Sequence, residues 1–187
     1  TEKKFVLGNL NKKIKYNFLL KKNSPTINKL RYLDDYKKTK IMGVYDLNDD
    51  LISKKEEKKF YTLIKKNIDK FDIILVADYG HGIITEKIRK LILKKGHKVF
   101  LNTQINSFNR GYHTVFKYKK VNTLVINENE LRYELRDKRS EISKLAKILS
   151  KKISVKNIIV TRGTYGSMLI SRKNNLIIFC PAFYQSN

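Results

Sequence analysis

Two glycines three residues apart follow an aliphatic run near the end of the chain. Residues 158–160 are Ile-Ile-Val, which is typical of a buried parallel strand, and Thr161-Arg162-Gly163-Thr164-Tyr165-Gly166 comes directly after them. Glycines at that point let backbone N–H groups approach an anion with no Cβ in the way. The motif predicts an anion-binding turn at a strand end, although the same spacing also occurs in turns that only join the two strands of a hairpin.

A second polar cluster, Asn127-Glu128-Asn129-Glu130, follows another aliphatic stretch, residues 123–126. Two strand ends would then carry side chains that bind a ligand. Asn127 and Glu130 also have the spacing of residues that cap a short helix, which would lie around Leu131. The spacing favours the two interpretations equally.

Further candidates precede these two clusters. Asp78 and Gly80 follow the apolar residues 71–77, and Asp78 either hydrogen-bonds a substrate hydroxyl or caps the helix region behind Gly82. We interpret the intervening His81 as a surface loop residue and give it no role. Lys29 and Arg31 alternate outward on one expected strand, so both face a ligand cleft or both face bulk water.

Two kinds of periodicity indicate the elements that position these residues. Residues 14–20, 27–33 and 40–47 alternate polar and apolar side chains between turn formers, and we expect them to form a small antiparallel sheet with one wet face. From Ser53 the period is helical, because Ser53 and Glu56 have the spacing of a capping box and apolar residues repeat every four positions to about Lys70.

Strands then alternate with helices. We expect strands at 73–77, 99–101, 123–126 and 157–161, a helix capped by Thr85, and a helix over 140–151. This alternation predicts a parallel α/β sheet whose ligands lie beyond the carboxyl ends of the strands. The polar segments 78–82, 102–110, 127–130 and 161–166 all fall at such ends. We therefore expect one domain over 1–187, with a β lid over about 13–50 and an α/β core over 53–187.

Composition restricts the function classes. The 187 residues are 41% hydrophobic, enough for one buried core, and we find no apolar run of membrane-spanning length and no signal peptide. The single cysteine, Cys180, excludes an internal disulfide framework, and the three histidines are scattered without metal-ligand spacing. We expect a cytoplasmic protein without a metal cage.

The chain is strongly basic, with 41 Lys and Arg against 17 Asp and Glu and a net charge of +24. A charge of this size is typical of proteins with polyanionic partners. Here the lysines are spread evenly, and no basic stripe interleaved with aromatic residues accompanies them. We therefore do not expect nucleic acid as the partner. A nucleotide or a phosphosugar is an anionic ligand that suits this positive charge.

In their order and spacing, these motifs resemble the ribokinase-like (PfkB) carbohydrate kinases, and more closely the heptose-phosphate kinase half of bifunctional ADP-heptose synthases. The matching pieces are Pro25-Thr26-x-x-Lys29-x-Arg31, Asp78-Tyr79-Gly80-x-Gly82, Asn127-x-x-Glu130 and Thr161-x-Gly163-x-x-Gly166. The resemblance implies a three-layer α/β fold, with helices on both faces of a parallel sheet and a small antiparallel β lid. It also implies transfer of a phosphoryl group from ATP to a hydroxyl of a sugar or sugar phosphate, with Mg²⁺.

The resemblance also implies roles for individual residues. Thr161, Arg162, Gly163 and Gly166 would bind the nucleotide together with Asn127 and Glu130, and these last two would also hold Mg²⁺ through water. The alternative for Arg162 is a solvated turn residue. The substrate set is Lys29, Arg31, Asp78, Gly80 and Arg110.

The chain departs from the family pattern at two points. The family's Gly-Ala-Gly-Asp segment, which supplies an anion hole and the catalytic aspartate, does not occur before Asn187, and the chain opens at Thr1 within what would be the family's N-terminal half. We therefore expect a fragment without a catalytic residue of its own and inactive in isolation. Asn102-Thr103-Gln104 stands where the heptose kinases have Asp-Pro-Lys, and Arg110 is the cation that could replace the lost lysine.

Two alternatives from other classes remain. The first is a non-catalytic nucleotide- or sugar-binding module of the same fold, or a lid that forms a homodimer through its exposed sheet face. The second is a basic protein associated with RNA. A heptose phosphate used for a surface-polysaccharide precursor is the substrate that the resemblance suggests.

Overall fold

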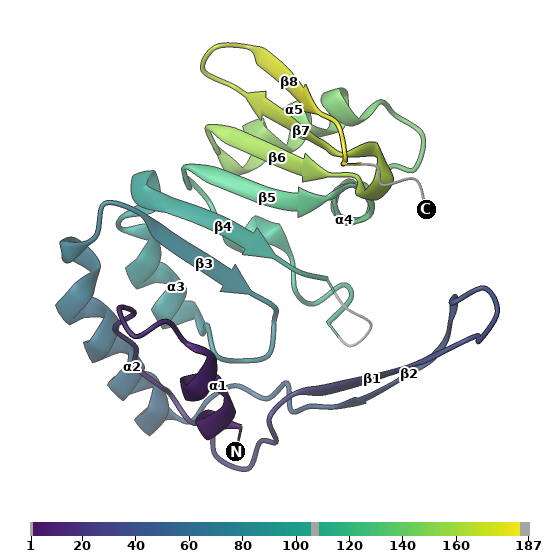
Figure 1. Ribbon diagram of the computed structural model, residues 1–187. Coiled ribbons are helices and arrows are strands. Elements are labelled where there is room, and N and C mark those ends of the chain that lie inside the picture. Colours follow the sequence, from purple (N-terminus) through teal and green to yellow (C-terminus); the bar gives the residue numbers. More distant parts are fainter. Residues whose placement is uncertain (1, 106–108, 184–187) are drawn as a thin grey trace.

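The computed structural model describes residues 2–105 and 109–183, and within these ranges the chain forms a six-stranded sheet, a separate two-stranded sheet and a set of helices (Figure 1). The order along the sheet is β3-β4-β5-β6-β7-β8. The first four strands are β3 (Ile74–Asp78), β4 (Val99–Thr103), β5 (Thr123–Asn127) and β6 (Asn157–Thr161), and they pair in parallel. The predicted parallel α/β sheet is confirmed.

Two antiparallel strands extend this sheet beyond β6. They are β7 (Ser167–Ser171) and β8 (Leu176–Cys180), which pair with β6 and with each other as consecutive hairpins. The sheet is therefore mixed, whereas the sequence patterns assigned no strand after residue 161. The hairpin connections leave no room for a crossover helix, so the chain direction must reverse at each turn.

Helices cover one face of the sheet. They are α2 (Lys54–Asn67), α3 (Glu86–Leu93), α4 (Glu128–Leu135) and α5 (Ile142–Ile153), with single turns η1 (Ile68–Lys70), η2 (Gly96–Lys98), η3 (Val115–Lys117) and η4 (Gly163–Tyr165). A single apolar core joins α3, α4 and α5 to alternate residues of the strands, such as Leu124 and Ile158, both fully buried. The residues between them, such as Val125 and Ile159, are only half-buried. Within the described part of the chain, no helix buries this second face, where we expected another helical layer.

The structure contains the helix caps that the sequence predicted at Ser53 and Thr85. The Ser53 side chain accepts from the Glu56 backbone N–H while Glu56 accepts from the Ser53 N–H, which is a complete capping box at the start of α2. Thr85 caps α3 through the N–H of Ile88. These caps satisfy N–H groups that a helix leaves free, and they fix where each helix begins.

The lid is a two-stranded ribbon, β1 (Asn28–Leu33) and β2 (Lys40–Asp46), paired antiparallel. It leaves the core and extends on the side toward which the carboxyl ends of β3 to β6 point (Figure 1). The third strand predicted at residues 14–20 is wrong, because this stretch has no regular secondary structure and, in the described part of the chain, the small sheet contains only β1 and β2. A short exposed helix, α1 (Lys3–Asn9), precedes it, and its sequence gave no apolar period by which to predict it.

Candidate functional site

The two polar clusters meet at one edge of the sheet. In the register of β5 and β6, Asn127 lies directly opposite Thr161. Because both strands run parallel and end together, the start of α4 and the glycine turn are neighbours, as expected for the carboxyl edge of an α/β sheet. Residues 34 positions apart in sequence are thereby brought into one site.

The glycine turn joins β6 to β7 as a hairpin, which was the alternative interpretation of its spacing. The Arg162 N–H donates to the Gly166 carbonyl at 2.8 Å and the Gly166 N–H donates to the Gly163 carbonyl at 2.9 Å. Both glycines have positive φ, 57° at Gly163 and 76° at Gly166. A hairpin connection does not exclude anion binding, since the turn still lies at the end of a parallel strand.

The two glycines have different surroundings. A Cβ built on Gly166 would lie 2.1 Å from the carbonyl oxygen of Cys180, so the chain end after β8 packs directly on this position. At Gly163 no atom of the described residues lies within 4 Å of such a Cβ. Gly166 is therefore required for packing, while the space above Gly163 is open to a ligand.

Arg162 is held in place by a carboxylate. Its Nε donates to Glu128 at 2.9 Å and its guanidinium lies 5.5 Å from the ring centre of Tyr165. Burial of Glu128 opposes its ionisation, but hydrogen bonds from Arg162 and Arg132 outweigh this and lower its pKa. Arg162 is thus a positioned cation beside the glycine turn and only partly exposed.

Asn127 and Glu130 form a second capping box, at the start of α4. The Asn127 side chain accepts from the Asn129 N–H at 2.8 Å, and one Glu130 oxygen accepts from the Asn127 N–H at 3.0 Å. The other Glu130 oxygen accepts from the N–H of Ile105 at 3.0 Å. The helix-capping role is therefore present, and Glu130 also anchors the segment after β4, which no local pattern indicated. Their nucleotide and metal roles stay predictions.

Asp78 is turned toward the protein interior. One of its oxygens accepts from the Gly80 N–H at 3.0 Å and the other accepts from the Tyr118 hydroxyl at 2.6 Å. The His113 ring nitrogen Nε2 lies 3.0 Å from the Asp78 carbonyl oxygen. Burial raises the pKa of Tyr118, and the nearby Asp78 carboxylate raises it further. The predicted contact of Asp78 with a substrate hydroxyl stays a prediction, and both carboxylate oxygens already have a donor within the chain.

Gly80 makes room for this network. It has φ of 73°, and an added Cβ would lie 2.4 Å from Nδ2 of Asn109 and 2.8 Å from Cγ of His113. Neither Tyr118 nor His113 was a candidate from sequence, because they lie 40 and 35 positions from Asp78 and no short motif connects them.

His81 joins the core to the base of the lid, so its interpretation as a surface residue is wrong. Only 9% of its side chain is exposed, and its Nδ1 lies 2.6 Å from a carboxylate oxygen of Asp49. Its Nε2 is buried and has no hydrogen-bond partner among the described residues. Nearby, Lys21 donates to the carbonyl oxygens of Asn48 and His81, and the Ile52 N–H donates to Gly82.

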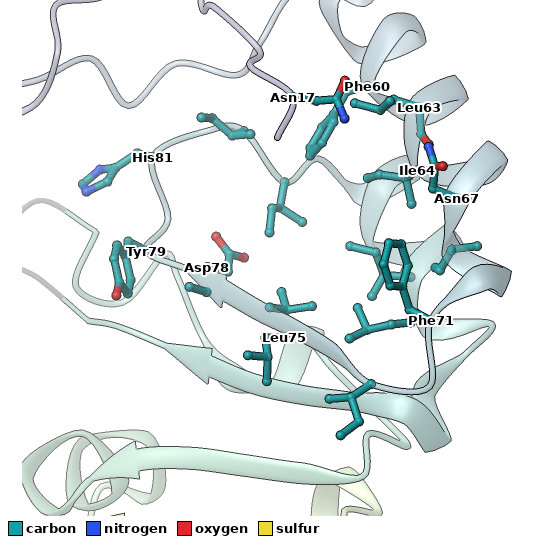
Figure 2. A pocket seen from close by; sticks show the side chains of 18 of the residues that line it. Asn17, Phe60, Leu63, Ile64, Asn67, Phe71, Leu75, Asp78, Tyr79 and His81 are labelled. Carbon is teal, nitrogen blue, oxygen red and sulfur yellow. The ribbon is translucent and has the colours of Figure 1, made fainter. Parts of the chain in front are cut away.

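A mainly apolar hollow of about 820 Å³ lies beside these residues, along the free edge of β3 (Figure 2). In Figure 2, Phe60 and Leu63 of α2 lie on one side of the hollow and Asp78 and Tyr79 on the other. Its floor is the apolar β3 strand itself.

The remaining predicted cations do not gather at the glycine turn. Lys29 and Arg31 lie opposite Tyr45 and Gly43 in the lid ribbon, so they share one face of it. Their charges contribute to a lowered pKa of Tyr45, whose main cause is the hydrogen bond from Lys40. Arg110 lies 5.7 Å above the ring of Tyr133 in α4. Their substrate roles stay predictions, and residues 106–108 of the predicted polar segment lie outside the described residues.

In the described ranges 2–105 and 109–183, no group of three or more His, Cys, Asp or Glu side chains is placed to hold a metal ion. Over the same residues, no helix is long and apolar enough to span a membrane.

Comparison with known proteins gives matches over most of the chain. The sequence model of a family described as pfkB family carbohydrate kinase matches residues 3–186. The bifunctional protein HldE of Aliarcobacter butzleri (strain RM4018) is 26% identical over 154 residues, which are 80% of this chain and 31% of that protein.

Solved structures share the fold. A ribokinase from Giardia lamblia superposes with a TM-score of 0.66 at 16% identity, over 88% of this chain and 50% of that one. A ribokinase of Arabidopsis thaliana, complexed with ribose and ATP, gives a TM-score of 0.56 at 17% identity, over 85% of this chain and 49% of that one. The fold is ribokinase-like, and the chain spans about half the length of these structures and less than a third of the curated relative.

Proposed function

The chain belongs to the pfkB family of carbohydrate kinases, and from this premise we propose that it forms the nucleotide-binding part of an enzyme that transfers a phosphoryl group from ATP to a sugar hydroxyl. The observation that carries the proposal is the register of Asn127 opposite Thr161, at an edge where no residue from 2–105 or 109–183 fills the space above Gly163. A polar helix start and a glycine turn side by side provide backbone donors where phosphate oxygens need them.

Phosphoryl transfer depends on positioning and on stabilising the charge of the equatorial oxygens. We infer that Thr161, Gly163 and Gly166 shape the phosphate-binding turn and that Arg162 supplies a cation there. Arg162 is already fixed by Glu128 at 2.9 Å, so its guanidinium loses little further freedom when a phosphate approaches.

Magnesium would accompany ATP, and Asn127 and Glu130 are the residues that would hold it. Their oxygens each accept a backbone N–H already, which leaves room for a further hydrogen bond from water rather than for a direct bond to a metal. Mg²⁺ usually keeps several of its waters, so this arrangement fits a role through water. When bound, the ion would neutralise charge on the phosphates, while the two residues hold the start of α4 beside them.

The acceptor sugar would lie between the lid and the core. We infer that Lys29 and Arg31 recognise its charged groups from the lid, with Asp78, Gly80 and Arg110 contributing from the core. A sugar phosphate, such as a heptose phosphate, suits the basic lid face better than a neutral sugar. A cytoplasmic location and a homodimer through the lid are further parts of this proposal.

ATP binding by the purified chain tests the proposal. Gly163→Val places a branched side chain in the open space where phosphate would lie, and we expect ATP affinity in the presence of Mg²⁺ to fall by about tenfold or more by calorimetry, since charge-assisted hydrogen bonds are lost. Gly8→Val is the control for the added side chain, because no described residue lies within 4 Å of a Cβ at Gly8 either, and it lies on the exposed helix α1. Equal ATP affinity in wild type and a folded Gly163→Val variant would remove the glycine turn from the nucleotide site.

A further inference from the structure

A second hollow lies between α4 and the segment that precedes η3. It has a volume of about 1220 Å³ and is formed by α4, the loop that follows it and residues 111–116. Among its lining residues are Arg136, Lys138 and Arg139, which lie within four positions directly after α4. Neither the sequence motifs nor the proposed kinase site uses these residues.

The acidic side chains around this hollow are already engaged. Glu134 accepts from the Thr114 hydroxyl at 2.5 Å and from the Val115 N–H at 2.7 Å. Asp137 accepts from the N–H groups of Ser140 and Arg139, and these hydrogen bonds lower its pKa to about 2. Both carboxylates hold loops in place by accepting hydrogen bonds from backbone N–H groups.

The cations differ from the carboxylates. Arg136, Lys138 and Arg139 are exposed, and across residues 2–105 and 109–183 none of the three has an ion pair. Arg132, by contrast, is paired with Glu128 and donates to the Ser140 carbonyl. These three cations outnumber Glu134 and Asp137, the two carboxylates that line the hollow, and form no ion pair with either of them.

The backbone that holds these cations is rigid. Arg136 is the left-handed cap of α4, with φ of 53°, and its N–H donates to the Tyr133 carbonyl. The Asp137 N–H donates to the Arg132 carbonyl, so the free carbonyl groups of the helix end are satisfied. On the rim, Arg110 stacks over the half-exposed ring of Tyr133. Three unpaired cations on a fixed loop, beside an exposed aromatic ring, are suited to an anionic ligand.

We propose that this basic hollow binds a small molecule carrying two or more phosphate groups, at a site separate from the glycine turn. A small ligand fits better than a nucleic acid, because the cations are confined to four consecutive positions around a concave space and do not form a stripe with several stacking platforms. The proposal does not depend on the kinase reaction.

Calorimetric titration of the purified chain with tripolyphosphate, at about 0.15 M salt to screen long-range attraction, tests the site. In the variant Arg136→Gln/Lys138→Gln/Arg139→Gln, we expect the affinity of one bound tripolyphosphate to fall by about tenfold or more. The matched control is Lys144→Gln/Lys147→Gln/Lys151→Gln, which removes the same charge from the exposed face of α5 and should leave that affinity within about twofold of wild type. Lys138→Gln/Arg139→Gln alone leaves the left-handed residue unchanged and should show part of the loss in a chain with the wild-type melting temperature.

Three results would overturn the proposal. Equal losses in both triple variants would mean that only net charge matters. Loss in Gly163→Val with no loss in the Arg136 triple variant would assign tripolyphosphate to the glycine turn, and would leave the kinase proposal intact. If the triple variant binds single-stranded RNA more weakly than wild type but binds tripolyphosphate equally well, the hollow is a nucleic-acid contact.

Discussion

At the scale of single residues, the carboxylates near the strand ends act first on the chain itself. Asp78 receives hydrogen bonds from Gly80 and Tyr118, and Glu130 receives them from Asn127 and Ile105. Leaving a buried carboxylate without such donors destabilises the folded state by more than the hydrogen bonds stabilise it when they are present. Variants of these residues should therefore be measured for stability as well as for ligand binding.

Tyr118→Phe removes the donor to Asp78 and leaves a buried oxygen without a partner. Because Tyr118 is fully buried, we expect a loss of about 1–3 kcal/mol in the free energy of unfolding, measured by urea denaturation. Tyr36→Phe is the control, since Tyr36 is 90% exposed and should change stability by less than about 0.5 kcal/mol. Equal stability of the two variants would mean that the contact contributes nothing.

Glu130→Gln separates helix capping from a metal role. The amide keeps one acceptor oxygen for two backbone N–H groups, so we expect a loss of about 1 kcal/mol in stability. If Glu130 also holds metal-bound water, ATP binding by the variant should need more Mg²⁺ than wild type, with the deficit recovered at high Mg²⁺. A stability loss with an unchanged Mg²⁺ requirement would remove Glu130 from the metal set.

At the scale of elements, the start of α2 connects the core to the segment before the lid. Glu56 accepts from the N–H of Ser53 at 2.7 Å and from the N–H of Lys22 at 2.8 Å. The Ser53 hydrogen bonds and the Lys22 N–H lower the pKa of Glu56 from 4.5 to about 2. One carboxylate thus caps a helix and holds a turn 34 residues away.

The hydrogen bonds of Glu56 make the stability of the folded chain depend on pH. Because the folded pKa is lower than the unfolded value, the stabilisation by Glu56 is complete above pH 4.5 and is lost as the pH falls from about 4.5 to about 2. Glu56→Gln should lower the melting temperature at pH 7, and its difference from wild type should shrink toward pH 2. Glu2→Gln, at an exposed position, is the control and should show no such convergence. A constant difference at all pH values would contradict the prediction.

At the scale of the whole molecule, the sheet is covered on one face and open at the β3 edge. Parallel strands are normally buried on both faces, yet Leu75 in the middle of β3 is 81% exposed and lines the apolar groove in Figure 2. Exposed apolar strands of this kind are contact surfaces for other chains or ligands.

The exposed groove should bind an apolar dye. We expect the folded chain to enhance the fluorescence of anilinonaphthalene sulfonate, and Leu75→Lys to reduce this enhancement by about half or more without changing the melting temperature by more than a few degrees. Ile41→Lys is the control, because Ile41 is 71% exposed on the lid and lies outside the groove. If both variants reduce the fluorescence equally, the loss is not specific to Leu75 and the groove is not the binding site.

The sequence alone predicted what depends on local pattern. Helical and strand periods, with the caps at Ser53 and Thr85, located the main elements, and their alternation predicted the four parallel strands. Local alternation failed at residues 14–20, because an alternating stretch becomes a strand only where it pairs with another strand, and this one has no such partner among the described residues.

The tertiary structure decided how the polar side chains are used. The motif around Asn127 and Glu130 was equally suited to capping or to ligand binding, and the contact with Ile105, 25 positions away, shows that the carboxylate also holds a neighbouring loop. The burial of His81 against Asp49 and the Tyr118–Asp78 pair likewise join residues 32 and 40 positions apart. A sequence fixes the chemistry available at each position through local spacing, but only the folded chain determines which donors reach each acceptor, since those partners come from distant segments.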